Sequence, residues 1–287
     1  LGIDPAKNIS SNASKNGIET ITDFFTSELA TKIKKEYKQA CIITANNVFA
    51  HADNLKDIVL GIKNLLSSDG VFIFEVSYLV DVLEKNLFDT IYHEHLAYHS
   101  VQPLVPFFAN AGLDLIDVQR ISTHGGSIRG TAQLAGGPHK NTGSIEALIA
   151  IEKAAGLDRA ETFINFGDNI QRVKNDLTEV LTTIKSQEKS IAGYGAPAKA
   201  TTLMYHFGID GQTIEFIVDD SEFKQKLYSP GLHIPIRPSE AIDKYKPDYI
   251  LILAWNFADD IIKKLKEIVD WKLKCIVPLP EYKEKVL

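Results

Sequence analysis

The sequence predicts an α/β protein built from two units of alternating strands and helices. The chain has 287 residues, which is more than one hydrophobic core usually serves. Apolar strand-like runs alternate with amphipathic segments over residues 1–137 and again over residues 190–287, a pattern typical of parallel sheets flanked by helices. Apolar residues recur at helical spacing from 142 to 189. We therefore expect a first domain at 1–137 and a second at 138–287, in which 138–189 is a helical connector.

In the first domain, strands and helices follow one another with short connections. Pro5 and Gly17 mark the start and the end of its first helix. The apolar run at 40–44 has the pattern of a strand covered on both faces, and Asp69-Gly70 should turn the chain into the next strand. The expected elements, in chain order, are a strand ending at Asp4, helix 5–16, strand 18–21, helix 27–37, strand 40–44, helix 53–67, strand 71–76 and helix 101–111.

Two strand-like runs, 113–121 and 127–135, follow the last of these helices and have no helix between them. They should therefore pair as an antiparallel hairpin. A parallel sheet that ends in an antiparallel hairpin is the arrangement of class I methyltransferases, a Rossmann-like fold. The chain opens at Leu1 in what reads as the end of a strand, so we expect this methyltransferase fold to begin upstream of Leu1.

The second domain is a smaller Rossmann-like α/β unit. Its first strand ends in a glycine-rich turn, and an acidic pair, Asp219-Asp220, follows its second strand. The expected elements are strand 190–195, helix 197–207, strand 215–218, strand 234–236, helix 239–244, strand 249–254, helix 259–269 and strand 274–277.

Composition excludes several classes of partner. The net charge is -6, and the lysines are scattered among acidic residues, so nucleic acid is not an expected partner. No apolar stretch is long enough to span a membrane. The two cysteines, Cys41 and Cys275, lie far apart in apolar runs, which favours buried reduced thiols in a cytoplasmic protein and provides no zinc site.

The motif Tyr92-His93-Glu94-His95 brings four polar groups together near the expected sheet. Three interpretations are open. A metal site would use His93, His95 and His99, although their spacing is not that of two ligands on one helix face. A structural polar cluster is the second. General acid and base catalysis is the third, because an imidazole titrates near neutrality, a neighbouring carboxylate can fix its tautomer, and a tyrosine hydroxyl can stabilise an oxyanion.

Two glycine-containing motifs could bind an anion. The first, His-Gly-Gly-Ser-Ile-Arg from His124 to Arg129, combines glycines with a guanidinium fork. The second, Gly-Tyr-Gly-Ala-Pro-Ala-Lys from Gly193 to Lys199, joins a strand to a helix, where backbone amides and the lysine could hold a phosphate. A tight turn alone would also require glycine there.

Three further positions follow strands, where ligands of open α/β sheets bind. Asp4 is placed to accept hydrogen bonds from ribose hydroxyls, or else to cap the helix that begins at Pro5. Asp23-Phe24 could contact an adenine or simply pack a turn. His51 is either a functional histidine or an exposed one at the start of a helix.

Four motifs in order, at residues 46–51, 92–95, 124–129 and 193–199, resemble the S-adenosylmethionine-dependent sugar C-methyltransferases. These enzymes act on nucleotide-linked ketodeoxysugars. The resemblance extends over nearly the whole chain. It implies a methyltransferase domain followed by an α/β domain that takes part in binding the nucleotide sugar.

The resemblance also implies roles for individual residues. His95 corresponds to the base that removes the C3 proton of a 4-keto sugar, and the enolate then attacks the methyl group of the cofactor. Tyr92, Glu94 and His51 correspond to groups that orient this base and stabilise the enolate. The cofactor contacts implied are Asp4, Asp23, Phe24 and Asn46. The substrate contacts implied are His124, Arg129, Gly195 and Lys199, of which Arg129 and Lys199 are candidates for the diphosphate.

Members of this family begin with a small cysteine-rich zinc lobe and a strand followed by a glycine-rich loop. Neither precedes Leu1, so any zinc would belong to that lobe and no metal is expected at the site itself. The resemblance implies a cytoplasmic enzyme, a small-molecule nucleotide-diphosphate sugar as substrate, and a monomer or weak dimer.

Two other functions remain open from the sequence. A non-catalytic protein could bind the nucleotide sugar without transferring a methyl group. An NAD(P)-dependent oxidoreductase could use the loop from Gly193 to Lys199 for the phosphates, with Asp219 or Asp220 as the acid that holds a ribose.

Overall fold

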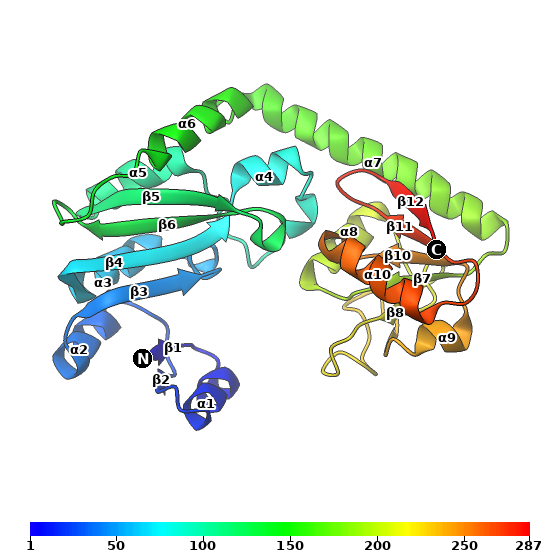
Figure 1. Ribbon diagram of the computed structural model, residues 1–287, viewed down its shortest axis with the longest axis horizontal. Coiled ribbons are helices and arrows are strands. Elements are labelled where there is room, and N and C mark those ends of the chain that lie inside the picture. The colour runs from blue at the N-terminus through cyan, green and yellow to red at the C-terminus, as the bar shows by residue number, and fades with distance from the viewer. The chain divides into compact units, whose positions relative to one another are not determined.

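The computed structural model describes residues 1–287, and the chain divides into two compact units (Figure 1). Unit 1 comprises Leu1–Leu79 and Leu96–Gly156, and unit 2 comprises Val80–His95 and Leu157–Leu287. These units differ from the predicted domains at two places. The segment Val80–His95 belongs to the second unit, although the sequence pattern placed it in the first. Residues 138–156, predicted to begin the connector, belong to unit 1.

Unit 1 contains every element predicted for the methyltransferase domain, with bounds that differ by a few residues, and also two short 3-10 helices and the first helix of the predicted connector. The elements of unit 1, in chain order, are β1 (Gly2–Ile3), α1 (Lys7–Lys15), β2 (Thr20–Ile21), α2 (Ser27–Tyr37), β3 (Ala40–Asn46), the 3-10 helix η1 (Phe49–His51), α3 (Leu55–Leu65), β4 (Leu66–Ser77), α5 (Val101–Asn110), β5 (Leu113–Ile121), the 3-10 helix η3 (Thr123–Gly125), β6 (Ser127–Leu134) and α6 (Ser144–Ala155).

Side-chain caps define the starts of two helices in unit 1. The hydroxyl of Thr26 accepts the Leu29 N–H ahead of α2, and the Asn54 amide oxygen accepts the Asp57 N–H ahead of α3. Helix α5 begins differently, because the buried carboxylate of Glu152 on α6 accepts the N–H groups of Val101 and Gln102. This carboxylate attaches α6 to the start of α5.

The main sheet of unit 1 has the strand order β3-β4-β6-β5 (Figure 1). Strands β3 and β4 are parallel, whereas β6 is antiparallel to both β4 and β5. The predicted hairpin is therefore confirmed, with Leu113 opposite Leu134 and Ile121 opposite Ser127. This combination is the class I methyltransferase arrangement predicted from the sequence.

Strand β3 is more exposed than its apolar sequence predicts. Strands β1 and β2 pair with each other and form no hydrogen bonds with the main sheet, so β3 lies at its edge. The Ile42 side chain is 63% exposed and Cys41 is also exposed, so the predictions of a fully covered strand and a buried Cys41 thiol are wrong. A cavity of about 430 Å³ lies beside this edge and is lined by residues of both β1 and β3.

The predicted turn at Asp69-Gly70 lies within β4. Ala40 is opposite Leu66 and Ile42 is opposite Val71, so residues 67–70 interrupt the pairing without ending the strand.

An aromatic cluster holds the sheet of unit 1 to the helix α5 and to η1. The ring centroids of Phe74 and Phe108 are 5.3 Å apart, and those of Phe49 and Phe74 are 5.6 Å apart. Phe49 is fully buried and belongs to η1, two residues before His51. The core of unit 1 therefore fixes the position of the turn that carries this candidate residue.

Unit 2 contains a second Rossmann-like sheet with the order β12-β11-β10-β7-β8-β9. All of its strand pairs are parallel except β11 with β12. Its elements are α4 (Leu79–Glu84), the 3-10 helix η2 (Phe88–Thr90), α7 (Ala160–Ser186), β7 (Ile191–Tyr194), α8 (Ala198–Phe207), β8 (Ile217–Val218), β9 (Ile236–Arg237), α9 (Ala241–Tyr245), β10 (Tyr249–Ile252), the 3-10 helix η4 (Trp255–Phe257), α10 (Ala258–Ile268), β11 (Lys274–Val277) and β12 (Lys283–Val286).

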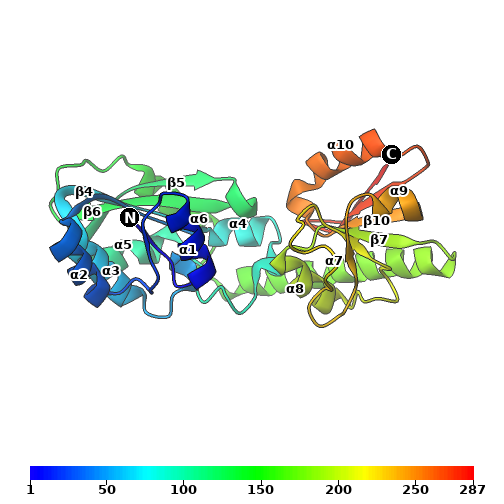
Figure 2. The ribbon, with the colours of Figure 1, turned by 90° about the horizontal axis from the view of Figure 1, so that it is seen from below.

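The 27-residue helix α7 is the longest element of unit 2 (Figure 1 and Figure 2). The sequence predicted this helix and every strand of unit 2 except β12, whose alternation of lysine with glutamate and valine lacks the apolar character of a core strand. No helix in the structure is both long and apolar enough to cross a membrane.

Gly130 is required by the packing of Phe74. The two residues lie opposite each other in the β4–β6 pair, and a Cβ atom on Gly130 would lie 2.2 Å from the Phe74 Cζ. Because Phe74 is fully buried in the aromatic cluster, its ring cannot move away. We expect Gly130→Ala to lower the free energy of urea-induced unfolding by about 1–3 kcal/mol.

The control for this prediction is Gly167→Ala in α7. Gly167 is exposed, and a Cβ there would have no neighbour within 4 Å. This change should leave stability unaltered or raise it by about 0.5–1 kcal/mol. Equal stabilities for Gly130→Ala and the wild type would show that the Phe74 ring has room to adjust.

Candidate active site

Polar groups gather where β3 and β4 end in unit 1. The Glu75 carboxylate is buried near the end of β4, where it accepts hydrogen bonds from the Thr123 hydroxyl at 2.7 Å and from Arg129 Nη2 at 3.0 Å. Burial alone would raise the pKa of Glu75, but these hydrogen bonds and the Arg129 charge hold it below its usual value. The carboxylate therefore remains charged and anchors the predicted anion-binding motif.

Two residues with left-handed backbone conformations lie beside this carboxylate. Asn47 and His124 have φ angles of +53°, and the Asn47 amide nitrogen is 3.0 Å from His124 Nε2. The Asn47 N–H also donates to the Glu75 carbonyl at 2.9 Å. Left-handed conformations are costly for non-glycine residues and concentrate at functional sites. The structure therefore brings the predicted residue His124 to the end of β3, where Asn46 is exposed.

His51 is exposed in η1, next to a hydrogen-bonded backbone junction. The Ala50 carbonyl accepts hydrogen bonds from the Leu96 N–H at 3.1 Å and the Ala97 N–H at 3.3 Å. These bonds fasten the segment that follows the Tyr92–His95 motif to the turn that carries His51.

His99 was considered only as a metal ligand in the sequence, and the structure shows it buried against Phe49. Its Nε2 atom has no hydrogen-bond partner. Burial lowers the pKa of His99 to about 4. No group of three His, Cys, Asp or Glu side chains in the structure could hold a metal ion.

The loop of Tyr92 and His95 belongs to unit 2. The two rings are stacked with centroids 4.4 Å apart, and the Tyr92 hydroxyl is 3.3 Å from His95 Nε2. His95 Nδ1 lies 2.8 Å from the Thr90 carbonyl. Because a carbonyl can only accept, the proton of a neutral His95 must be on Nδ1, which leaves Nε2 as the basic nitrogen.

Glu94 is not the group that contacts His95 Nδ1. The Thr90 carbonyl, and not a carboxylate, fixes the tautomer of His95, while Glu94 is exposed. The Glu94 charge acts on the tyrosine instead. Burial raises the pKa of Tyr92 above its usual value, and the negative charges of Glu94 and Asp89 add to this. Tyr92 therefore keeps its proton at neutral pH and can donate a hydrogen bond.

Lys199 lies at the start of α8, but it does not project into solvent as a phosphate contact would. Its Nζ is 3.4 Å from the buried carboxylate of Asp89 and 4.0 Å from the centroid of the Trp255 ring. Gly195 is explained by the turn itself, since its φ angle is +87° and a Cβ would lie 2.4 Å from that of Ala254. Asp89 was not identified from the sequence as a partner of Lys199. The one feature that could have indicated it is the presence of a carboxylate within an apolar run.

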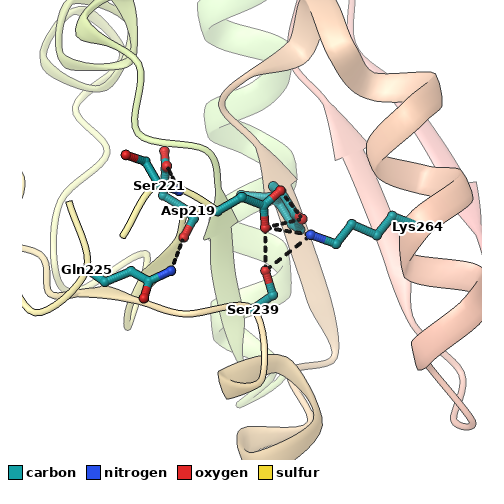
Figure 3. Close-up of polar contacts among 7 residues, drawn as sticks. Asp219, Ser221, Gln225, Ser239 and Lys264 are labelled. Atoms are coloured by element: carbon teal, nitrogen blue, oxygen red, sulfur yellow. Dashed lines mark hydrogen bonds and ion pairs between the residues drawn. The ribbon is translucent and has the colours of Figure 1, made fainter. Parts of the chain in front are cut away.

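The acids that an oxidoreductase would need already have partners. Asp219 accepts the Ala196 N–H at 2.7 Å, while Asp220 accepts from Lys264 and Ser239. Figure 3 shows Lys264 and Ser239 converging on the turn after β8, with Gln225 against the Asp219 backbone. A cavity of about 290 Å³ lies here, at the ends of β7 and β10, where the strand order reverses.

The residues expected to bind the cofactor follow β1 and β2. Asp4 Oδ1 accepts the Ala6 N–H at 2.8 Å, and Ala6, not Asp4, is the N-cap of α1. The second carboxylate oxygen of Asp4 accepts no hydrogen bond in the structure, so a ribose could use it. Phe24 is 71% exposed beside Asp23, and its ring is available to an adenine. These groups fit a nucleoside.

The chain matches known C-methyltransferases. Residues 122–280 match the family model of the C-methyltransferase C-terminal domain. The C-methyltransferase NovU of Streptomyces niveus is 37% identical over 281 residues, and the match covers 98% of this chain and 67% of that protein.

Solved structures similar to this chain include two methyltransferases. Magnesium protoporphyrin IX methyltransferase from Synechocystis PCC 6803, with bound SAH, is 13% identical over 47% of this chain and 63% of that chain, with a TM-score of 0.36. A SAM-dependent methyltransferase from Anabaena variabilis is 14% identical over 46% of this chain and 67% of that chain, with a TM-score of 0.38.

The burial of His99 predicts a pH-dependent stability. Because its folded-state pKa of about 4 lies below the unfolded value, its neutral form stabilises the fold above pH 6.5, and this contribution is lost as the pH falls towards 4. The expected loss is roughly 3 kcal/mol. Urea-induced unfolding at pH 7 and pH 4 measures this. Between the two pH values the wild type should lose about 3 kcal/mol more of its free energy of unfolding than His99→Phe loses.

Exposed His93 supplies the control for this measurement. His93→Gln should keep the pH dependence of the wild type. If His99→Phe keeps that dependence as well, a different group is responsible for it.

Proposed function

This chain belongs to the family of S-adenosylmethionine-dependent C-methyltransferases, and we propose that it methylates C3 of a nucleoside-diphosphate-linked 4-keto-deoxysugar. Membership of this family favours methyl transfer over both alternatives, the nicotinamide oxidoreductase and the non-catalytic binding protein. The observation that carries the proposed substrate class is the pairing of Tyr92 with His95. It is supported by the resemblance of the four motifs to enzymes that act on such sugars.

A base is needed because a sugar carbon is not nucleophilic by itself. Removal of a proton next to a ketone gives an enolate, whose carbon can accept a methyl group. His95 is suited to this step, since its Nε2 is unprotonated in the tautomer fixed by Thr90. Tyr92 lies 3.3 Å from that nitrogen and can donate a hydrogen bond to the enolate oxygen.

When bound, S-adenosylmethionine supplies an electrophilic methyl group. We propose that Asp4 holds its ribose hydroxyls, that Asp23 and Phe24 contact its adenine, and that Asn46 contributes from the end of β3. The second oxygen of Asp4 and the exposed ring of Phe24 support these roles.

The remaining roles are proposals of the same kind. His51 and Glu94 would support the base and the enolate, and His124 would contact the sugar. Arg129 gives two of its donor nitrogens, Nε and Nη2, to Glu75, so its third nitrogen remains for a phosphate. The backbone at Gly195 is the corresponding candidate in unit 2.

We also propose a cytoplasmic protein that acts on this small molecule as a monomer or weak dimer, without a nucleic acid or membrane partner. The net charge of -6 supports the exclusion of nucleic acid.

Exchange of the C3 proton with solvent tests the base directly. In deuterated water and without a methyl donor, the protein should place deuterium at C3 of a thymidine-diphosphate 4-keto-6-deoxysugar, as followed by NMR. His95→Asn should slow this exchange by about 10²–10⁴-fold, because the general base is lost. Binding of the sugar nucleotide should remain nearly unchanged in calorimetry.

The matched control is His93→Asn, which alters an exposed imidazole two residues away. It should exchange at the wild-type rate. Wild-type exchange no faster than background, with the ligand shown to be bound, would point to a different carbonyl substrate. Exchange at the full rate in His95→Asn would assign the base to another residue.

Asp4→Asn tests the cofactor site. The asparagine oxygen can still accept the Ala6 N–H, but the charge offered to the ribose hydroxyls is lost. We expect the affinity for S-adenosylmethionine to fall by about 10–100-fold, as for loss of hydrogen bonds to a charged group. Calorimetry measures this, with exposed Asp53→Asn as the control. An unchanged affinity in Asp4→Asn would remove Asp4 from the site.

A further inference from the structure

Three side chains from distant parts of the sequence meet inside unit 2. Asp89 is in η2, Lys199 is in the first turn of α8, and Trp255 is in η4. The indole N–H of Trp255 donates to Asp89 Oδ2 at 2.6 Å, and Lys199 Nζ lies 3.4 Å from the same oxygen. The Lys199 ammonium also lies 4.0 Å from the centroid of the Trp255 ring. These contacts attach the loop of η2 to two elements that border the sheet.

Burial makes each member of this cluster depend on the others. The Asp89 side chain is fully buried, and that of Lys199 is 14% exposed. Burial raises the pKa of Asp89 and lowers that of Lys199, and their mutual attraction opposes both shifts. Asp89 Oδ1 has no hydrogen-bond partner. Without Lys199, the buried carboxylate would therefore lose the cation that balances its charge.

A short covalent path links this cluster to His95. Asp89 is bonded to Thr90, whose carbonyl accepts the Nδ1 proton of His95 at 2.8 Å. Phe88, on the other side of Asp89, packs against Phe207 of α8 with ring centroids 5.1 Å apart. The carbonyl that selects the tautomer of His95 thus lies in a 3-10 helix that α8 holds by one ion pair and by the contacts of Phe88 with the rings of His206 and Phe207.

We propose that Lys199 is a positioning residue for the base, and that its charge holds Asp89 and with it the Thr90 carbonyl in place. It then serves the reaction through His95 and does not bind the diphosphate. The ion pair explains why a lysine stands at the end of the glycine motif. The Lys199 charge is already neutralised by Asp89 inside the fold, so no phosphate is needed to explain it. This inference rests on the proposed function, in which His95 is the base.

Lys199→Met separates positioning from phosphate binding, because methionine preserves the apolar stem and removes the charge. A misplaced base should lower the rate of C3 exchange at saturating sugar nucleotide by about 100-fold, with affinity for that ligand within about twofold of wild type. A phosphate contact predicts the reverse result, weakened binding with an unchanged rate at saturation, and that outcome would overturn the proposal.

Two further variants protect this test against misfolding. Lys264→Met removes a lysine that is paired with Asp220 in the same unit but has no path to Thr90, and it should exchange at the wild-type rate. The second is the double variant Asp89→Asn/Lys199→Met, which removes both charges of the buried ion pair. The introduced asparagine oxygen can still accept the Trp255 N–H. This double variant should recover part of the exchange rate lost in Lys199→Met. Independent, multiplicative effects of the two changes on the rate would contradict coupling through the ion pair.

Nitrogen-15 NMR of His95 gives a readout that requires no substrate. In the wild type the neutral ring should carry its proton on Nδ1, whereas Lys199→Met should show a mixture of both tautomers. Identical His95 spectra in the two proteins would overturn the positioning role, even if exchange is never observed. If the wild type does not exchange the C3 proton, the proposed function is contradicted, but the NMR comparison of the His95 tautomers remains valid.

Discussion

An imidazole can act as a base only if one of its nitrogens lacks a proton, and the loop of unit 2 is arranged around this requirement. The Thr90 carbonyl holds the proton of His95 on Nδ1, and the stacked Tyr92 ring restricts the orientation of the imidazole. The group in direct contact with His95 Nδ1 is a backbone carbonyl and not a charged side chain. A backbone acceptor fixes the tautomer by geometry alone and leaves Nε2 without a proton in the neutral ring.

The parts of the fold that could be predicted are those fixed by local pattern. The hairpin of β5 and β6 follows from two apolar runs with no room for a helix between them. The motif at 92–95 could be singled out as a candidate site from its residue types alone. Exposure could not be predicted in the same way. The run that forms β3 is as apolar as a central strand, yet Ile42 is exposed because β1 pairs with β2 and not with this edge.

Ion pairs between residues that are distant in sequence account for the buried carboxylates that the sequence did not reveal. Arg129 lies 54 residues from Glu75, and a single sequence shows the cation without its acid. The same holds for Lys199 and Asp89. In both cases the sequence shows a cation beside glycines, which predicts an anion-binding site. In the fold, each of these cations neutralises a buried carboxylate. Glu94 differs from these two, because it lies close in sequence to the group on which it acts: its charge raises the pKa of Tyr92.

The assignment of Val80–His95 to unit 2 has a consequence for how the protein can be divided. The chain passes from one unit to the other at three places, after Leu79, His95 and Gly156. A fragment that starts at residue 157 would contain Lys199 and Trp255 without Asp89, and so would bury a cation that lacks its anion. The two units are therefore not independent modules that could be exchanged at one linker, and any recombined enzyme would have to inherit both segments together.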